Sequence, residues 1–450
     1  MTFEPNLVWT HLFPGDVSFE PLAPAGMLDA LRVPARDGTR RVLVSHGQPT
    51  SALPDLDGFD GLAAINCRAL RGEQLRDAGF EYVRHFAMLP SFASLRWLIP
   101  LDSAAVSASA FHLFAAVRVA TRIKHLLARG AARSGVPIWY RDSIWVAQRR
   151  TPPLAKAINS LFPSRQIALA MSSGAPGPAE RRKPSLAVMD EAGRTLAFVK
   201  VAVSPISDAL VRNEAAVLAG LPLAAPGALA PRAIFAGEID GRFALVQTPV
   251  SGRPPGPGLT PAHHKLLDSL RRPERKPLLE TSWGRSIRDR VVDGPVDREL
   301  LRAFDECAGA LDGEHVPTAV VHGDFVPWNL RGSPDTLAAY DWENASLDGV
   351  PIADELHHRL VVGHLMSGWS ADRAVREVDT AVASHGLLLG QRQATALAVA
   401  YLIEHTTRLI EHTHNANDPM LVWYREVLAR TAARLGTLHH AGKPLTRGAA

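Results

Sequence analysis

The sequence has few of the residues that mark secreted, disulfide-bonded or zinc-binding proteins. Only two cysteines, Cys67 and Cys307, occur in 450 residues, too few for a disulfide framework or a zinc motif. The most apolar run, Ala104 to Val117, is shorter than the roughly 20 residues that span a bilayer. The first residues include acids and a proline but no basic segment, so no signal peptide is expected. We therefore predict a reduced, cytoplasmic protein without a transmembrane segment.

A strong excess of one charge is also missing. The sequence contains 49 Lys and Arg and 45 Asp and Glu, so its net charge is +4. This excess suits an anionic ligand such as a nucleotide, but it is too small to predict a nucleic-acid partner. Hydrophobic residues make up 46% and charged residues 21%, the balance of a globular chain. The length predicts two or three domains.

Residues 1–150, which end before the linker Thr151-Pro152-Pro153, are predicted to form a small α/β accessory domain. Strand patterns at 41–47 and 80–86 precede a proline-free segment at 104–133 that predicts one long helix. The second half of this helix is rich in Arg and Lys. Such a helix lies on an anionic membrane surface, or it packs on its domain with cations at the negative end of its dipole. We expect packing.

After residue 151 the pattern changes to short alternating strands with glycine-centred turns, one helix and two further strands. The order predicts an antiparallel small lobe over 151–252. A Gly/Pro-rich link at 251–258 leads into a mainly helical large lobe over 253–450. The predicted class is α+β. The predicted small-lobe strands are 166–171, 184–189, 196–202, 232–238 and 243–249, with the helix at 208–221.

Two groups of polar residues lie next to apolar sequence, where they are costly unless they bind something. Lys200 stands inside a hydrophobic strand, and Glu214 on the following helix is its predicted partner. His322-Gly323-Asp324 follows a valine-rich run, with Asn329 and Asp341 soon after. Phosphoryl transfer needs a cation on the nucleotide phosphates, oxygen ligands for Mg²⁺ and a carboxylate that accepts the hydroxyl proton. Lys200, Asn329 with Asp341, and Asp324 are predicted to take these roles.

The segments His322-Gly323-Asp324-Phe325-Val326-Pro327-Trp328-Asn329-Leu330 and Tyr340-Asp341-Trp342-Glu343 resemble the aminoglycoside phosphotransferase/choline kinase family, which has a protein-kinase-like fold. The resemblance covers about residues 160–440. It implies that Asp324 is the catalytic base, that Asn329 and Asp341 bind Mg²⁺, and that Lys200 and Glu214 form the ion pair at the phosphates of ATP. It also implies that Asp354, in Gly349-Val350-Pro351-Ile352-Ala353-Asp354, braces the catalytic loop.

The nucleotide contacts of the small lobe depart from the protein-kinase pattern. The loop at 172–178 has two glycines but also two prolines, so it is not a Gly-x-Gly-x-x-Gly loop. Backbone N–H groups near Ser173 and Gly174 are the predicted phosphate donors. Adenine is expected against 246–250, where Pro249 lacks an N–H and Gln247 or Val250 must donate.

Residues 70–105 are similar to the tail of class I methyltransferases, with a Gly-Phe helix end, a strand and a Leu-Pro turn. No glycine-rich cofactor loop accompanies them. We therefore expect an accessory region that positions the acceptor or docks a protein partner. Two histidine pairs, His263-His264 and His357-His358, are predicted to be exposed.

The leading functional hypothesis is an ATP- and Mg²⁺-dependent phosphotransferase acting on a hydroxyl of a small molecule, such as a sugar, an amino alcohol or an aminoglycoside. One alternative is a catalytically inactive nucleotide-binding regulator or scaffold. Another is a methyltransferase, which would require S-adenosylmethionine to bind residues 1–150.

Overall fold

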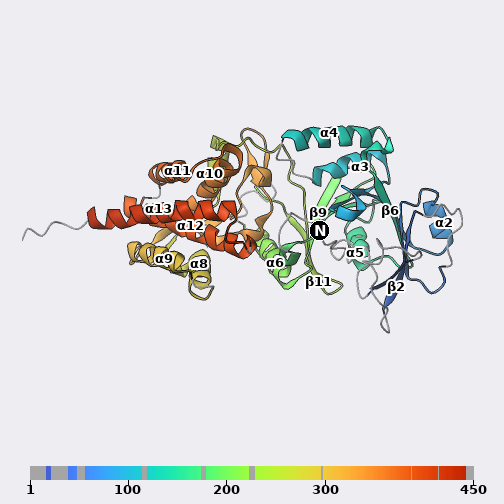
Figure 1. Ribbon diagram of the computed structural model, residues 1–450, viewed down its shortest axis with the longest axis horizontal. Coiled ribbons are helices and arrows are strands. Elements are labelled where there is room, and N and C mark those ends of the chain that lie inside the picture. The colour runs from blue at the N-terminus through green and yellow to red at the C-terminus, as the bar shows by residue number, and fades with distance from the viewer. Residues whose placement is uncertain are drawn as a thin grey trace, which may run out of the picture. The chain divides into compact units, whose positions relative to one another are not determined.

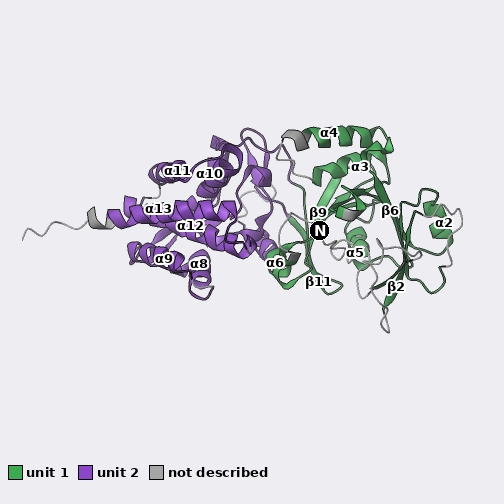
Figure 2. Cartoon of the chain, in the orientation of Figure 1, with its two compact units in different colours: residues 1–211, 233–249 green, residues 212–232, 250–450 purple. Residues whose placement is uncertain are grey.

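The computed structural model divides the chain into two compact units (Figure 2). Unit 1 comprises residues 1–211 and 233–249, and unit 2 comprises residues 212–232 and 250–450. The predicted α+β class is confirmed: a large sheet dominates unit 1 and helices dominate unit 2 (Figure 1). The structure describes residues 17–21, 39–47, 56–113, 119–173, 179–221, 229–294, 297–386, 388–413 and 415–441.

Unit 1 is built on one sheet of eleven strands in the order β1-β2-β3-β6-β4-β5-β7-β8-β9-β11-β10. The first three strands pair in parallel and every other pairing is antiparallel, so β6 lies antiparallel between β3 and β4. The strands are β1 (Val17–Pro21), β2 (Arg40–His46), β3 (Gly61–Ile65), β4 (Tyr82–Leu89), β5 (Trp97–Pro100), β6 (Asp142–Gln148), β7 (Ala168–Ser172), β8 (Ser185–Met189), β9 (Thr195–Val201), β10 (Ala233–Ile239) and β11 (Arg242–Gln247). The strands predicted from the sequence are therefore confirmed to within about three residues.

The sheet runs through the boundary that the sequence predicts near residue 150. Strand β5 pairs with β7, with Trp97 opposite Ser172 and Leu98 opposite Met171. Leu98 belongs to one buried cluster that also contains Phe86 from one side of the boundary and Val188 from the other. Both sides thus share hydrogen bonds and apolar contacts within one compact unit. The division at residue 150 remains a prediction.

Helices cover both faces of this sheet. Helix α5 (Pro153–Leu161) packs in the same cluster as Phe86, and helix α3 (Ala104–Ala110) packs in the same cluster as Ala87. Because consecutive strand residues point to opposite faces of a sheet, the two helices lie on opposite faces. The prediction of one helix over 104–133 is wrong. A 3₁₀ turn, η3 (Phe111–Leu113), ends α3. It points the buried Phe111 ring toward Trp139, and the centroids of the two rings are 5.5 Å apart. The second helix, α4 (Val119–Arg133), ends at the last residue of the predicted segment, two residues before Gly135.

Unit 2 is mainly helical, with two small sheets. Its strand order is β12-β13-β16 in one sheet and β14-β15 in the other. The elements are the second half of α6 (Pro205–Gly220), α7 (Pro261–Ser269), β12 (Arg271–Lys276), α8 (Ser282–Val292), α9 (Arg298–Ala310), β13 (Val316–Val321), β14 (Leu330–Gly332), β15 (Leu337–Ala339), β16 (Ser346–Gly349), α10 (Ile352–Ser367), α11 (Ala371–Ser384), α12 (Gln391–Thr413) and α13 (Pro419–Ala441).

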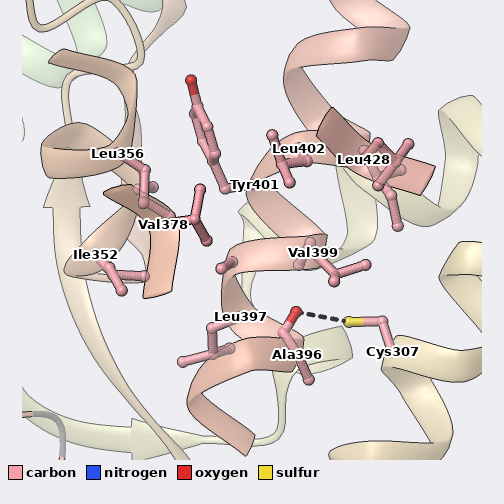
Figure 3. Packing of buried hydrophobic residues seen from close by; sticks show 14 of the residues in the cluster. Cys307, Ile352, Leu356, Val378, Ala396, Leu397, Val399, Tyr401, Leu402 and Leu428 are labelled. Atoms are coloured by element: carbon pink, nitrogen blue, oxygen red, sulfur yellow. Dashed lines mark hydrogen bonds between the residues drawn. The ribbon is translucent and has the colours of Figure 1, made fainter. Parts of the chain in front are cut away.

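Helix α12 is the centre of the unit 2 core (Figure 3). Its residues from 396 to 403 are each at most 2% exposed, because neighbouring helices cover every side of it. Ala396 and Ala400 share one face of α12, and the Cys307 thiol of α9 donates to the Ala396 carbonyl oxygen at 3.1 Å. Burial raises the pKa of Cys307 to about 12, so this thiol is an inert core group. Both cysteines are free, as predicted, and both are buried.

Among the helices that the structure describes, none is long and apolar enough to cross a membrane.

Leu98→Ala tests whether the two sides of the predicted boundary fold together. Leu98 is 1% exposed, so we expect the free energy of unfolding to fall by about 2–5 kcal/mol. Amide hydrogen exchange should speed up in both β4 and β8. Ile206→Ala, at a position 41% exposed, is the control and should change stability by less than about 0.5 kcal/mol. Faster exchange in β4 alone would contradict a shared folding unit.

Candidate active site

The loop after β13 is held in an unusual backbone shape by α10. Gly323 has φ of +75°, and a Cβ placed there would lie 2.3 Å from the carbonyl oxygen of Asn344. The two carboxylate oxygens of Asp354 accept hydrogen bonds from the backbone N–H groups of His322 at 2.7 Å and Gly323 at 2.9 Å. Glycine is therefore required here, and Asp354 braces the loop as the sequence predicts.

His322 joins this loop to the segment that carries Asp341. Its buried ring donates from Nε2 to the Tyr340 carbonyl oxygen at 3.0 Å, while Nδ1 accepts from the Asp324 N–H at 3.2 Å. The Tyr340 N–H donates in turn to the Asn329 carbonyl oxygen at 3.0 Å. These contacts bring the backbones that carry Asp324, Asn329 and Asp341 together.

The Asp324 carboxylate is oriented by two side chains. Its Oδ2 accepts from Asn329 Nδ2 at 2.9 Å, and its Oδ1 lies 3.1 Å from His357 Nε2. Burial works to raise the pKa of Asp324, but the hydrogen bond from His357 and the electrostatic influence of the nearby His357 and His322 rings outweigh it and lower the pKa. Its side chain remains 36% exposed. Asp324 is thus an ionised carboxylate that can accept a hydrogen bond from an incoming hydroxyl.

A buried tyrosine pair stands behind His357. Tyr401 Oη lies 3.2 Å from His357 Nδ1 and 3.3 Å from Tyr424 Oη. Burial raises the pKa of Tyr401 far above its usual value, so its hydroxyl stays protonated and can donate to Nδ1. Donation to Nδ1 leaves the ring proton of His357 on Nε2, facing Asp324.

The prediction that His357 and His358 are exposed is wrong, since they are only 3% and 1% exposed. His263 is fully buried as well. Helix α10 is buried on almost every side, so consecutive positions both lie inside. Sequence reasoning missed the contact between His357 and Asp324 because the two residues are 33 positions apart and no local pattern indicates that they meet. A histidine three residues after the bracing Asp354 was the available signal.

Three carboxylates converge beside the loop: Glu214, Asp341 and Glu343 each offer an oxygen, and these oxygens lie within 4.8 Å of one another. Asn213 Nδ2 donates to the carbonyl oxygens of Glu343 and Ala345, both at 3.0 Å, and so fixes this part of α6 against the 342–345 turn. Asp341 has φ of +71°, a left-handed conformation that costs energy and is common at functional sites. Oxygen-only donors are the set that Mg²⁺ prefers.

This arrangement differs from the predicted metal ligands, Asn329 and Asp341, by adding Glu214 and Glu343. Because Nδ2 of Asn329 donates to the carbonyl oxygen of Asp324 at 3.0 Å and to its carboxylate at 2.9 Å, only its Oδ1 is left to face a metal ion. Asp341 lies in the cluster as predicted. The individual metal-binding roles remain predictions.

The structure gives information on only one of the two predicted phosphate donors, Ser173 and Gly174. Ser173 is half-buried, and its N–H already donates to the Arg96 carbonyl oxygen at 2.9 Å, which extends the β5–β7 pairing. The structure thus argues against Ser173 as a phosphate donor, because strand pairing occupies its N–H. Gly174 lies outside the described residues.

The other contacts remain predictions. Lys200, on β9, is 8% exposed and Glu214 is 0% exposed. They belong to different compact units, so their pairing is untested. Gln247, buried at the end of β11, and the half-buried Val250 also fall on opposite sides of the division between the units.

No family model and no curated protein matches the chain. Solved structures similar to it include a thermostable mutant of aminoglycoside phosphotransferase APH(4)-Ia with ADP and hygromycin B. That match has a TM-score of 0.43 and 15% identity, and it covers 62% of this chain and 98% of that one.

Two further solved structures are similar. A choline/ethanolamine kinase family protein from Mesorhizobium loti has a TM-score of 0.36 and 13% identity, covering 61% of this chain and 88% of that one. Amicoumacin kinase hAmiN, with AMP-PNP, Ca²⁺ and Ami, has a TM-score of 0.38 and 13% identity, covering 58% and 88%. All these likenesses are remote. The resemblance of residues 70–105 to a methyltransferase tail receives no support from them.

Gly323→Ala tests how the loop is built, and Gly313→Ala is its matched control. Both glycines have positive φ, +75° and +72°, but a Cβ at Gly313 meets nothing within 4 Å. Gly313→Ala should lower the free energy of unfolding by about 1–2 kcal/mol, the cost of a left-handed residue. Gly323→Ala should cost more, since the Asn344 backbone must also move. Thermal denaturation measures both, and equal losses would contradict the close approach to Asn344.

Proposed function

We propose that this protein is an ATP-dependent phosphotransferase that moves the γ-phosphoryl group to a hydroxyl of a small molecule. The observation that carries the proposal is the ionised Asp324, held by Asn329 and His357, on a loop joined through His322 to the segment of Asp341. Phosphoryl transfer depends mainly on positioning and charge stabilisation. This arrangement supports the positioning, and the charge stabilisation would come from Mg²⁺ and Lys200.

Asp324 has the role of catalytic base. It accepts a hydrogen bond from the acceptor hydroxyl, orients its oxygen and takes the proton as the new O–P bond forms and the bond to the leaving ADP breaks. His357 is a positioning residue, because it fixes one carboxylate oxygen and leaves the other for Asn329. Acceptor binding next to Asp324 requires no further ionisation change at neutral pH.

The carboxylate cluster suits the metal that accompanies the nucleotide. Asp341, with Asn329 Oδ1, would hold Mg²⁺, and Glu343 and Glu214 lie near enough to complete or support that set. A bound Mg²⁺ supplies neutralisation of the phosphate charge. Lys200 has the role of pairing with the α- and β-phosphates. The acceptor class is a sugar, an amino alcohol or an aminoglycoside-like compound.

Asp324→Asn and Asp341→Asn separate chemistry from nucleotide binding. Asp324→Asn should lower turnover by about 10²–10⁴-fold while leaving the affinity for Mg·AMP-PNP unchanged, because it removes only the base. Asp341→Asn should weaken both turnover and affinity. The measurements are ADP release with a panel of sugars, amino alcohols and aminoglycosides, and calorimetric titration of Mg·AMP-PNP.

Asp335→Asn is the control for both variants, since Asp335 is exposed on the neighbouring β14–β15 hairpin. It should behave like the unaltered protein. Nucleotide binding without ADP release on any acceptor in the panel would favour the alternative of an inactive nucleotide-binding regulator. Full turnover in Asp324→Asn would end the proposed mechanism.

His357→Asn tests the orientation of the base through its pH dependence. His357 lowers the pKa of Asp324, so its loss should raise that pKa. Activity needs the carboxylate and is lost as pH falls through its pKa, so the acidic limb of the kcat/KM profile should move to higher pH. The direction of this move follows from the loss of a charge-assisted hydrogen bond to the carboxylate.

His358→Asn is the matched control, because it removes an equally buried imidazole that contacts the Pro257 carbonyl oxygen and not Asp324. Its acidic limb should stay in place. A shift of the same size in both variants would indicate a general loss of packing and would contradict the positioning role.

A further inference from the structure

Helix α4 presents its large apolar side chains outward and its small ones inward. An α-helix advances about 100° per residue, so Ile123, Leu126 and Leu127 share one face while Ala128 and Ala132 share the opposite one. The alanines pack on the cluster of Ala108 and Phe111. The other face carries Ile123 at 55%, Leu126 at 69% and Leu127 at 68% exposure. A helix that only serves its own core has the reverse arrangement.

The exposed face continues beyond the helix. The short 3₁₀ turn η4 (Pro137–Trp139) contacts α4, and it adds Ile138 at 79% exposure, with Val136 at 43% just before it. We call Ile123, Leu126, Leu127, Val136 and Ile138 the α4 patch. Single exposed aliphatic residues need no explanation, but several gathered within sixteen residues indicate a surface that binds something apolar.

The charges on the segment that carries the α4 patch have one sign. Residues 103–141 contain six Arg and Lys and no Asp or Glu. Lys124 flanks the apolar face of α4 on one side, and Arg129 and Arg133 flank it on the other. Within the part of the chain that the structure describes, no ion pair involves these three cations. The partner of the α4 patch is therefore apolar in its middle and anionic around it.

We propose that the α4 patch docks the protein on the surface of an anionic lipid bilayer. The aliphatic side chains enter the boundary between headgroups and acyl chains, and the flanking cations extend their stems along it to reach lipid phosphates. A second copy fits less well, because a symmetric interface would set the same cations face to face. The packed-helix interpretation of the sequence holds only for the alanine face of α4.

Sedimentation with lipid vesicles tests this proposal on the full chain. The protein should bind phosphatidylcholine vesicles that contain phosphatidylglycerol, bind pure phosphatidylcholine vesicles far less, and lose affinity as salt is raised. Leu126→Ser with Leu127→Ser should weaken binding by about tenfold or more. Lys124→Gln with Arg129→Gln should weaken it about fivefold for each cation removed.

Leu365→Ser with Met366→Ser is the matched control, since these two side chains are 56% and 45% exposed on α10 of unit 2. It should bind vesicles like the unaltered protein. Circular dichroism and ADP release should be unchanged in the α4 variants, which lie outside the catalytic groups. Equal binding by the α4 variants and the unaltered protein would overturn the proposal. The proposal would also be overturned if the unaltered protein did not bind vesicles but formed a concentration-dependent dimer that the α4 variants could not form.

A fluorescent label gives a second readout that does not depend on affinity. Because both native cysteines are buried, Leu127→Cys provides one accessible thiol for an environment-sensitive dye. Its emission should shift to the blue when anionic vesicles are added, while the same dye at Leu365→Cys should not respond. No shift at position 127 in vesicle-bound protein would show that another surface binds the lipid.

Discussion

The two hydrogen bonds that Asp354 accepts from the backbone of His322 and Gly323 are the constraint on which the site depends. They set the start of α10 against the end of β13, and only a glycine fits the contact with Asn344 that follows. Once the loop has this shape, the Asp324 side chain faces Asn329 and His357 at hydrogen-bonding distance. The geometry of the candidate site thus follows from how a backbone turn is braced.

The surroundings of Asp324 combine rigidity with access. His357 and Tyr401 are buried in the helical core, where α12 is enclosed on every side, so their positions are set by packing. The Asp324 carboxylate itself stays partly exposed, so a small molecule can reach it. A buried histidine and tyrosine can hold a charged carboxylate because the polar atoms that link Asp324, His357, Tyr401 and Tyr424 all have hydrogen-bond partners.

The sheet of unit 1 joins parts of the chain that the sequence assigns to separate domains. This single sheet ties the residues before the predicted boundary to those after it through the β5–β7 pairing, and the same pairing occupies the Ser173 N–H that was expected to bind phosphate. On the outer side of α3, helix α4 buries alanines and exposes leucines. The strands of the predicted small lobe, β7 to β11, and the proposed membrane-facing helix thus belong to one compact unit.

The sequence by itself determined the strand and helix order from 166 to 249, the α+β class and the absence of disulfides, because periodicity and residue type report local structure. It also indicated Asp324, Asn329 and Asp341, which stand close together along the chain. Only the tertiary structure decided that His357 contacts the Asp324 carboxylate, that Glu214 joins Asp341 and Glu343, and which face of α4 is exposed. These facts depend on contacts between residues far apart in sequence, which no local pattern encodes.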